Sequence, residues 1–199
     1  MLLKYVGSYP VVTHKGVSFD STKPDKYTFF NALFEILEIV NSSEDRDIII
    51  DTKETKHYTS RDLIELLKEY CLDIDSIIEA KEKRVEQVID NYSQSAKSNT
   101  GLSLDEKSAI LGNISIMRDY YKQYMINEKV YEVALEKLAD ILSEKHIDTI
   151  TFVLGHNYGM VLSDLILVLQ EHKPPYDATM EFFTDDNGIA YGKLNMNRN

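Results

Sequence analysis

The sequence predicts a mainly α protein: an antiparallel helical bundle with long helices, plus a small antiparallel β-sheet or β-hairpins. Apolar residues recur every three or four positions over long stretches, turn-forming residues separate these stretches, and extended β-type runs are short. The 199 residues, 43% of them hydrophobic, are enough for one domain with a substantial core. We therefore expect a single helix-rich domain over residues 1–199, with hairpins at about 1–20 and 177–195 as appendages.

The first fifty residues predict a hairpin, a helix and a strand. Two short extended segments, 10–13 and 17–19, flank a turn at His14-Lys15-Gly16. Thr22 and Pro24 are start signals for a helix. Its apolar stripe consists of Tyr27, Phe30, Leu33, Phe34, Leu37 and Val40. The β-branched run at 48–50 then predicts a short buried strand.

The middle of the chain predicts two long antiparallel helices. The first is capped by Thr59 or Ser60 and extends to about Ser98; an Asp near residues 73–75 could cap a new helix, so one helix or two fit the pattern. After a turn, Ser103 and Glu106 have the spacing of a capping box. A helix from there to residue 145 would span roughly 65 Å. Part of so long a rod should face solvent or a partner.

The second long helix carries two apolar stripes. The main seam alternates steps of three and four and consists of Ile114, Met117, Tyr121, Tyr124, Glu128, Tyr131, Leu135, Leu138 and Leu142. A second stripe consists of Ile126, Val130 and Val133. Its cover is either the C-terminal hairpin of this chain or a helix of a partner protein. These three residues are our candidate partner-binding residues.

The last fifty residues predict a strand, a buried helix and a hairpin. Residues 149–154 are rich in β-formers, and 160–171 are almost uniformly apolar. Pro174-Pro175 ends that helix. The run Asp185-Asp186-Asn187-Gly188 lies between two extended segments, which is typical of a β-hairpin turn.

Composition narrows the classes of partner. With 22 Lys and Arg against 33 Asp and Glu, the net charge of −11 argues against binding to nucleic acid or anionic membranes and favours a basic partner. A single cysteine, Cys71, cannot form an intramolecular disulfide. With no signal peptide or membrane-spanning run, this composition predicts a cytoplasmic protein.

One motif points to an enzyme. Gly155-His156-Asn157, between a predicted strand and a predicted helix, resembles the second histidine motif of the histidine-phosphatase superfamily. The resemblance implies an Arg-His-Gly element on an early strand, where the His takes the phosphoryl group and the Arg holds it. The nearest candidate, Thr13-His14-Lys15-Gly16, lacks that Arg. We therefore interpret the motif as a turn with a structural histidine, and keep phosphoryl transfer at His156 as an alternative.

No pattern predicts a metal or another cofactor. The five histidines are scattered and no two have the i, i+4 spacing of a helical zinc site. The acidic turn at 185–188 lacks the alternating ligands and terminal Glu of a calcium loop. We expect no catalytic, cofactor-binding or metal-binding residues.

The N-terminal segment resembles one known group of proteins. Met1-Leu2-Leu3-Lys4-Tyr5, the segment Gly16-Val17-Ser18-Phe19-Asp20 and the segment Lys23-Pro24-Asp25-Lys26-Tyr27 are similar to small flagellar proteins, the cochaperones that bind the flagellin export chaperone FliS. The resemblance covers the first 27 residues and the order of elements. It implies a helix-rich bundle that stacks helices on the chaperone without chemistry of its own.

We therefore expect a cytoplasmic, non-enzymatic protein-interaction module acting as a cochaperone in flagellar export. An alternative from another class is a homo-oligomeric structural protein, in which the stripe of Ile126, Val130 and Val133 pairs with itself.

Overall fold

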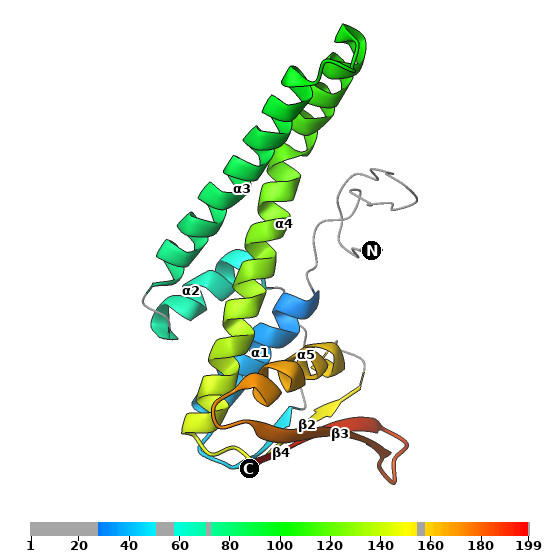
Figure 1. The fold of residues 1–199 in the computed structure, drawn as a ribbon. Coiled ribbons are helices and arrows are strands. Elements are labelled where there is room, and N and C mark those ends of the chain that lie inside the picture. Colours follow the sequence, from blue (N-terminus) through cyan, green and yellow to red (C-terminus); the bar gives the residue numbers. More distant parts are fainter. Residues whose placement is uncertain (1–27, 51–57, 71–72, 155–157, 199) are drawn as a thin grey trace.

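A computed structural model describes residues 28–50, 58–70, 73–154 and 158–198 (Figure 1). The helices are α1 (Thr28–Ser42), α2 (Ser60–Tyr70), α3 (Ile74–Ser98), α4 (Leu104–Glu144) and α5 (Tyr158–Glu171). The strands are β1 (Asp47–Ile50), β2 (Thr149–Val153), β3 (Tyr176–Thr184) and β4 (Ala190–Arg198). The fold class is confirmed: the protein is mainly α with a small sheet.

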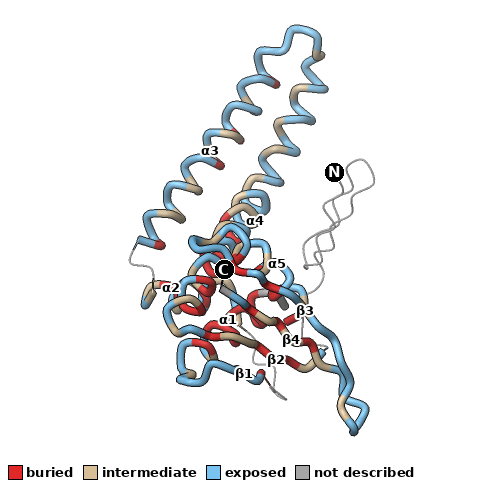
Figure 2. Tube along the Cα trace, turned by 60° about the horizontal axis from the view of Figure 1, so that its bottom comes forward, coloured by how far each residue is buried: buried red, intermediate tan, exposed pale blue. Residues whose placement is uncertain are grey.

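The described residues form a body and an arm. In the body, α1 and α5 lie against the sheet, and the C-terminal half of α4 packs on α1, α2 and α5 (Figure 1). In the arm, α3 and the N-terminal half of α4 run antiparallel and project away from the body. Buried residues concentrate in the body, whereas the arm is mostly exposed (Figure 2).

The sheet is mixed, which corrects the expected antiparallel arrangement. Its strand order is β1-β2-β4-β3, and β1 pairs with β2 in parallel, with Ile48 opposite Ile150. Parallel neighbours need a long crossover connection. Here α2, α3 and α4 all lie between β1 and β2 in the chain, and that connection brings the two strands side by side in the same direction.

The C-terminal hairpin belongs to the body and is not an appendage. β4 pairs with β3 on one side and with β2 on the other, both antiparallel. Leu194 and Met196 on β4 are buried beneath the helices. The turn lies where the sequence predicts it, and Gly188 has a φ of 81°, a conformation that strongly favours glycine. The hairpin therefore supplies two of the four described strands of the sheet.

The helix boundaries settle what the sequence left open. The first of the two predicted long helices, from residue 59 or 60 to about 98, is divided into α2 and α3, with Asp73 at the N-cap position of α3. The capping box that begins α4 is confirmed: the Ser103 side chain accepts from the Glu106 N–H, and the Glu106 carboxylate accepts from the Ser103 N–H. At 41 residues, α4 is about 60 Å long.

Some predictions fall outside the described residues. They are the N-terminal hairpin at about 1–20, the start signals Thr22 and Pro24, Cys71 and His156. Among the described helices, none combines the length and the apolar character that crossing a bilayer requires.

Candidate partner-binding surface

The predicted partner-binding residues lie inside the body, so that prediction is wrong. Ile126 is 7% exposed, Val130 0% and Val133 5%, and all three belong to the main hydrophobic core. The C-terminal half of α4 packs against α1, α2 and α5 at once. A helix surrounded on several sides needs apolar residues on several sides. The second stripe therefore packs against other helices of this chain. It is not covered by the C-terminal hairpin.

The main seam of α4 is half core and half surface. Its C-terminal members Leu135, Leu138 and Leu142 are buried in the body, as the seam predicts. Its members on the arm, Met117 and Tyr121, are exposed. The pattern is continuous along the helix, but its cover ends where α4 leaves the body.

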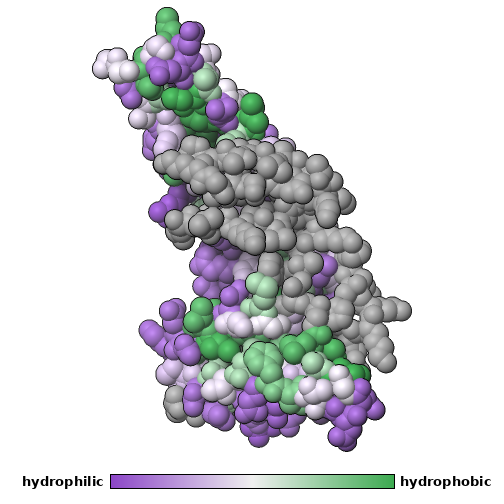
Figure 3. Space-filling view, turned by 90° about the vertical axis from the view of Figure 1, so that its right-hand side faces the viewer, coloured by the Kyte–Doolittle hydropathy of each residue, from purple (hydrophilic) through white to green (hydrophobic). Residues whose placement is uncertain are grey.

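Exposed apolar residues on the arm portion of α4, some of them from the main seam, define a candidate surface, which we call the α4 stripe. It consists of Ile110, Met117, Tyr120 and Tyr121, each between 37% and 41% exposed. Three of them are separated by seven and four residues, which places them on one face of the helix, and Tyr120 borders that face. Figure 3 shows apolar side chains among polar ones on the free end of the arm. The stripe thus offers large, half-exposed apolar side chains along a projecting helix.

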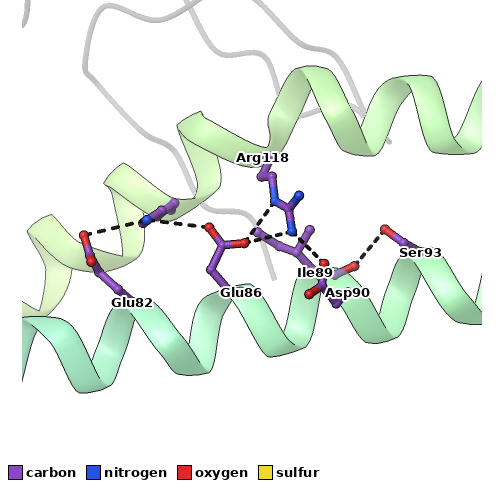
Figure 4. A network of polar contacts seen from close by, with 7 residues as sticks. Glu82, Glu86, Ile89, Asp90, Ser93 and Arg118 are labelled. Atoms are coloured by element: carbon purple, nitrogen blue, oxygen red, sulfur yellow. Dashed lines mark hydrogen bonds and ion pairs between the residues drawn. The ribbon is translucent and has the colours of Figure 1, made fainter.

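An ion-pair network fixes the two helices of the arm. Arg118 on α4 donates from Nε to Glu86 Oε2 at 3.0 Å and from Nη2 to Asp90 Oδ1 at 2.6 Å (Figure 4). Lys122 Nζ lies 3.6 Å from Glu86 Oε1 and 3.8 Å from Glu82 Oε1. Partly exposed pairs of this kind each contribute about 0 to 1 kcal/mol, so their main effect is to set the register of α3 on α4.

A small apolar seam within the arm also holds its two helices together. Val85, Ile89 and Ala96 on α3 are buried, yet they lie outside the main core of the body. At the free end, Ser103 donates to Glu106 through its backbone N–H and its hydroxyl. These hydrogen bonds hold the pKa of Glu106 below its ordinary value. The arm is therefore an ordered unit with a defined surface.

The arm differs from the rest of the chain in charge. Residues 74–125 contain eight acidic and seven basic side chains, whereas the remaining residues contain 25 acidic and 15 basic ones. Nearly all of the net negative charge therefore lies outside the arm. Docking on the arm would depend on apolar contact more than on attraction between opposite charges.

A buried polar pair joins α1 to the start of α5, two residues after His156 in the sequence. The Tyr158 hydroxyl at the start of α5 donates to the Glu35 carboxylate on α1, and both side chains are buried. Asn31, one turn earlier on α1, accepts from the backbone N–H of Tyr58. These contacts tie α1 to α5 and to the segment before α2. They satisfy buried polar groups, as a structural role requires.

The described histidines do not gather into a site. His172 Nε2 lies 3.4 Å from Asp140 Oδ1, and His146 Nδ1 lies 3.1 Å from the Ser143 carbonyl oxygen. Across the described ranges, no group of three or more His, Cys, Asp or Glu side chains is placed to hold a metal ion. Tyr131 on α4 donates to Asp164 on α5, and burial together with this bond raises the pKa of the tyrosine. These contacts join elements of the body.

No protein-family model, curated protein or solved structure matches this chain. The candidate function therefore depends on the residues and the geometry described above.

The sequence predicts only part of the α4 stripe. Helical spacing places Met117 and Tyr121 on an apolar face, but spacing does not say where along a helix the cover stops. The available signal was the length of the helix together with the tyrosines at 120, 121 and 124. Tyrosine has an apolar ring and a polar hydroxyl, and is enriched at protein interfaces.

Proposed function

We propose that this chain is a non-enzymatic, cytoplasmic protein-interaction module whose arm binds an amphipathic helix of a partner protein along the α4 stripe. The observation that carries the proposal is the row of half-exposed apolar side chains on a helix that projects from the body. A two-helix arm covers each helix on one side only, and a docked third helix extends the same packing.

The ion pairs of the arm support a partner helix over a membrane surface. The basic residues beside the stripe, Arg118 and Lys122, are paired with acidic side chains of α3, whereas helices that lie on anionic membranes present basic residues towards the lipid beside their apolar face. The arm itself is nearly neutral, so a partner helix with an apolar face and a neutral or basic rim fits its charge.

The proposed partner is the flagellin export chaperone FliS, with this chain as its cochaperone. The support is the resemblance of residues 1–27 to the flagellar cochaperones, together with an interaction surface that needs no chemistry. Binding along a helix face is also the mode of action that this resemblance implies.

Isothermal titration of the full chain with purified FliS tests the proposal. We expect Met117→Glu or Tyr121→Glu to weaken binding at least about tenfold, roughly 1.4 kcal/mol, because the charge would be desolvated in the contact. Ser115→Glu is the matched control. Ser115 is exposed and close in sequence, but it lies about 160° around the helix from Met117 and about 140° from Tyr120. This control should bind like the unmodified chain.

Three results would contradict the proposal. Equal loss in the control and in the stripe variants would mean that charge on the arm, not the stripe, weakens binding. Full binding by the stripe variants would place the site elsewhere. Absence of binding to FliS, with a dimer that the stripe variants dissociate in light scattering, would favour the homo-oligomer instead.

A further inference from the structure

The sheet has a long open edge at β3. The strand order β1-β2-β4-β3 places β3 at the border, and among the described strands only β4 pairs with it. β3 is nine residues long, and α5 packs on its first part, where Tyr176 and Ala178 are buried. Towards the turn, the hairpin extends beyond the helices (Figure 1).

The ladder shows which backbone groups face this edge. The Leu154 N–H donates to the Ala190 carbonyl and the Met196 N–H to the Asp148 carbonyl, so even-numbered residues of β4 bond to β2. In antiparallel pairs bonding alternates along the strand, so odd-numbered residues of β4 bond to β3. The register places them opposite the odd-numbered residues of β3. The N–H and C=O groups of Ala178, Met180 and Phe182 therefore point away from the sheet.

The side chains along this edge are apolar and acidic. Phe182 is 64% exposed, and Phe183 stacks on Tyr191 with ring centroids 5.5 Å apart. Residues 176–188 contain four acidic side chains and no Lys or Arg. The acidic residues are Asp177, Glu181, Asp185 and Asp186.

These charges favour a basic occupant of the edge. If β3 paired with β3 of a second copy around Thr179, Asp177 of each copy would lie opposite Glu181 of the other. Like charges directly opposite each other destabilise a strand pair. An extended segment with alternating basic residues would instead place opposite charges across from Asp177 and Glu181.

We propose that the open edge of β3 binds an extended Lys- or Arg-rich segment of a partner protein, which adds to the sheet as a fifth strand. The backbone groups of Ala178, Met180 and Phe182 supply the main-chain hydrogen bonds, and Asp177 and Glu181 select basic side chains. The exposed Phe182 and Phe183 provide apolar contact at the turn end. This surface is separate from the α4 stripe and does not depend on it.

Amide hydrogen exchange of the full chain, read residue by residue by NMR, tests this inference with an alternating lysine–valine octapeptide as the probe. Added peptide should slow exchange at Ala178, Met180 and Phe182. Thr179, Glu181 and Phe183 already bond to β4 and serve as internal controls that should not change. An alternating glutamate–valine octapeptide should have no effect.

Two variants separate strand addition from attraction between charges. Met180→Pro removes one N–H that points away from the sheet and makes no hydrogen bond to β4. Proline is tolerated at such edge positions. It should weaken peptide binding at least about tenfold, roughly 1.4 kcal/mol. Glu181→Lys leaves the backbone intact and should weaken binding of the lysine–valine peptide while allowing the glutamate–valine peptide to bind.

Several outcomes would overturn the inference. They are unchanged exchange at the even-numbered amides, equal binding of both peptides, or full binding by Glu181→Lys. The first would mean that the acidic residues only protect the edge against association, a common role of edge charges. If Met180→Pro does not fold, Glu181→Lys alone decides.

Discussion

At the scale of single residues, Gly192 on β4 is fixed by the packing of one aromatic ring. A Cβ atom at this position would lie 2.2 Å from Cζ of Phe152, whose side chain is fully buried. We expect Gly192→Ala to destabilise the protein by about 1 to 3 kcal/mol, because the buried ring would have to shift within the packed core. Urea unfolding measures the change. The double variant with Phe152→Leu should recover part of the loss, and an additive double variant would contradict this account.

The capping residues of α4 give a prediction about pH. The hydrogen bonds from Ser103 lower the pKa of Glu106 from its ordinary value of 4.5. A lowered pKa in the folded state contributes stability that is present above the ordinary value and is lost as the pH falls through the folded value. Ser103→Ala should therefore raise the pKa of Glu106, measured by NMR titration of its carboxyl carbon. The control is Glu79, whose pKa is lowered by Lys83 and should not change.

At the scale of elements, α3 and the N-terminal half of α4 should open separately from the body. Their buried residues Val85, Ile89 and Ala96 lie outside the main core, and most of the arm surface is exposed. Regions with few buried contacts exchange amide hydrogens through local opening. Native-state hydrogen exchange should thus show lower opening free energies at the end of the arm than in α5. Uniform values would mean that arm and body unfold as one unit.

Gly112 offers a way to strengthen the arm without changing its contacts. It lies within α4, and a Cβ added there would meet nothing within 4 Å. Gly112→Ala should stabilise the helix by about 0.5 to 1 kcal/mol, because alanine restricts the unfolded chain and favours helix. Exchange at amides near the end of the arm should slow. Faster exchange would mean that glycine is required at this position.

The elements were largely predictable, and the surfaces were not. Ser103 with Glu106, the acidic turn at Asp185 and the β-branched strands are local signals, and each produced the expected structure. The parallel pairing of β1 with β2 depends on how three intervening helices pack, and no local pattern encodes it. Val130 and Met117 look equally apolar in sequence. Only the tertiary fold decides that the first is core and the second is surface.

At the scale of the whole molecule, the C-terminal half of α4 is the centre of the core. Val130→Asp should unfold the body, because a buried, unpaired charge costs several kcal/mol, a large part of the stability of a typical domain. Circular dichroism and thermal melting check this. Glu128→Gln on the exposed side of the same turn is the control and should melt like the unmodified chain. A folded Val130→Asp protein would mean that the second stripe is a surface and not part of the core.

The two candidate surfaces lie on different parts of the molecule and differ in chemistry. The α4 stripe is apolar on a nearly neutral arm, whereas the β3 edge is acidic and belongs to the body that carries most of the net charge. Binding at the edge should therefore weaken with added salt, and binding at the stripe should depend on salt much less. A single partner could occupy both surfaces only through two separate segments, one helical and one extended.

The continuity of α4 has a mechanical consequence. This one helix carries Leu138 and Leu142 inside the body and Ile110 near the free end of the arm, so no joint separates the core from the tip. A tilt of about 10° where α4 leaves the body would move the tip by about 6 Å, given a rise of about 1.5 Å per residue. Small rocking of the helix is thus amplified into a wide sweep, which enlarges the volume the tip can search. A partner that binds the tip would transmit force along α4 to the buried side chains that hold the body together.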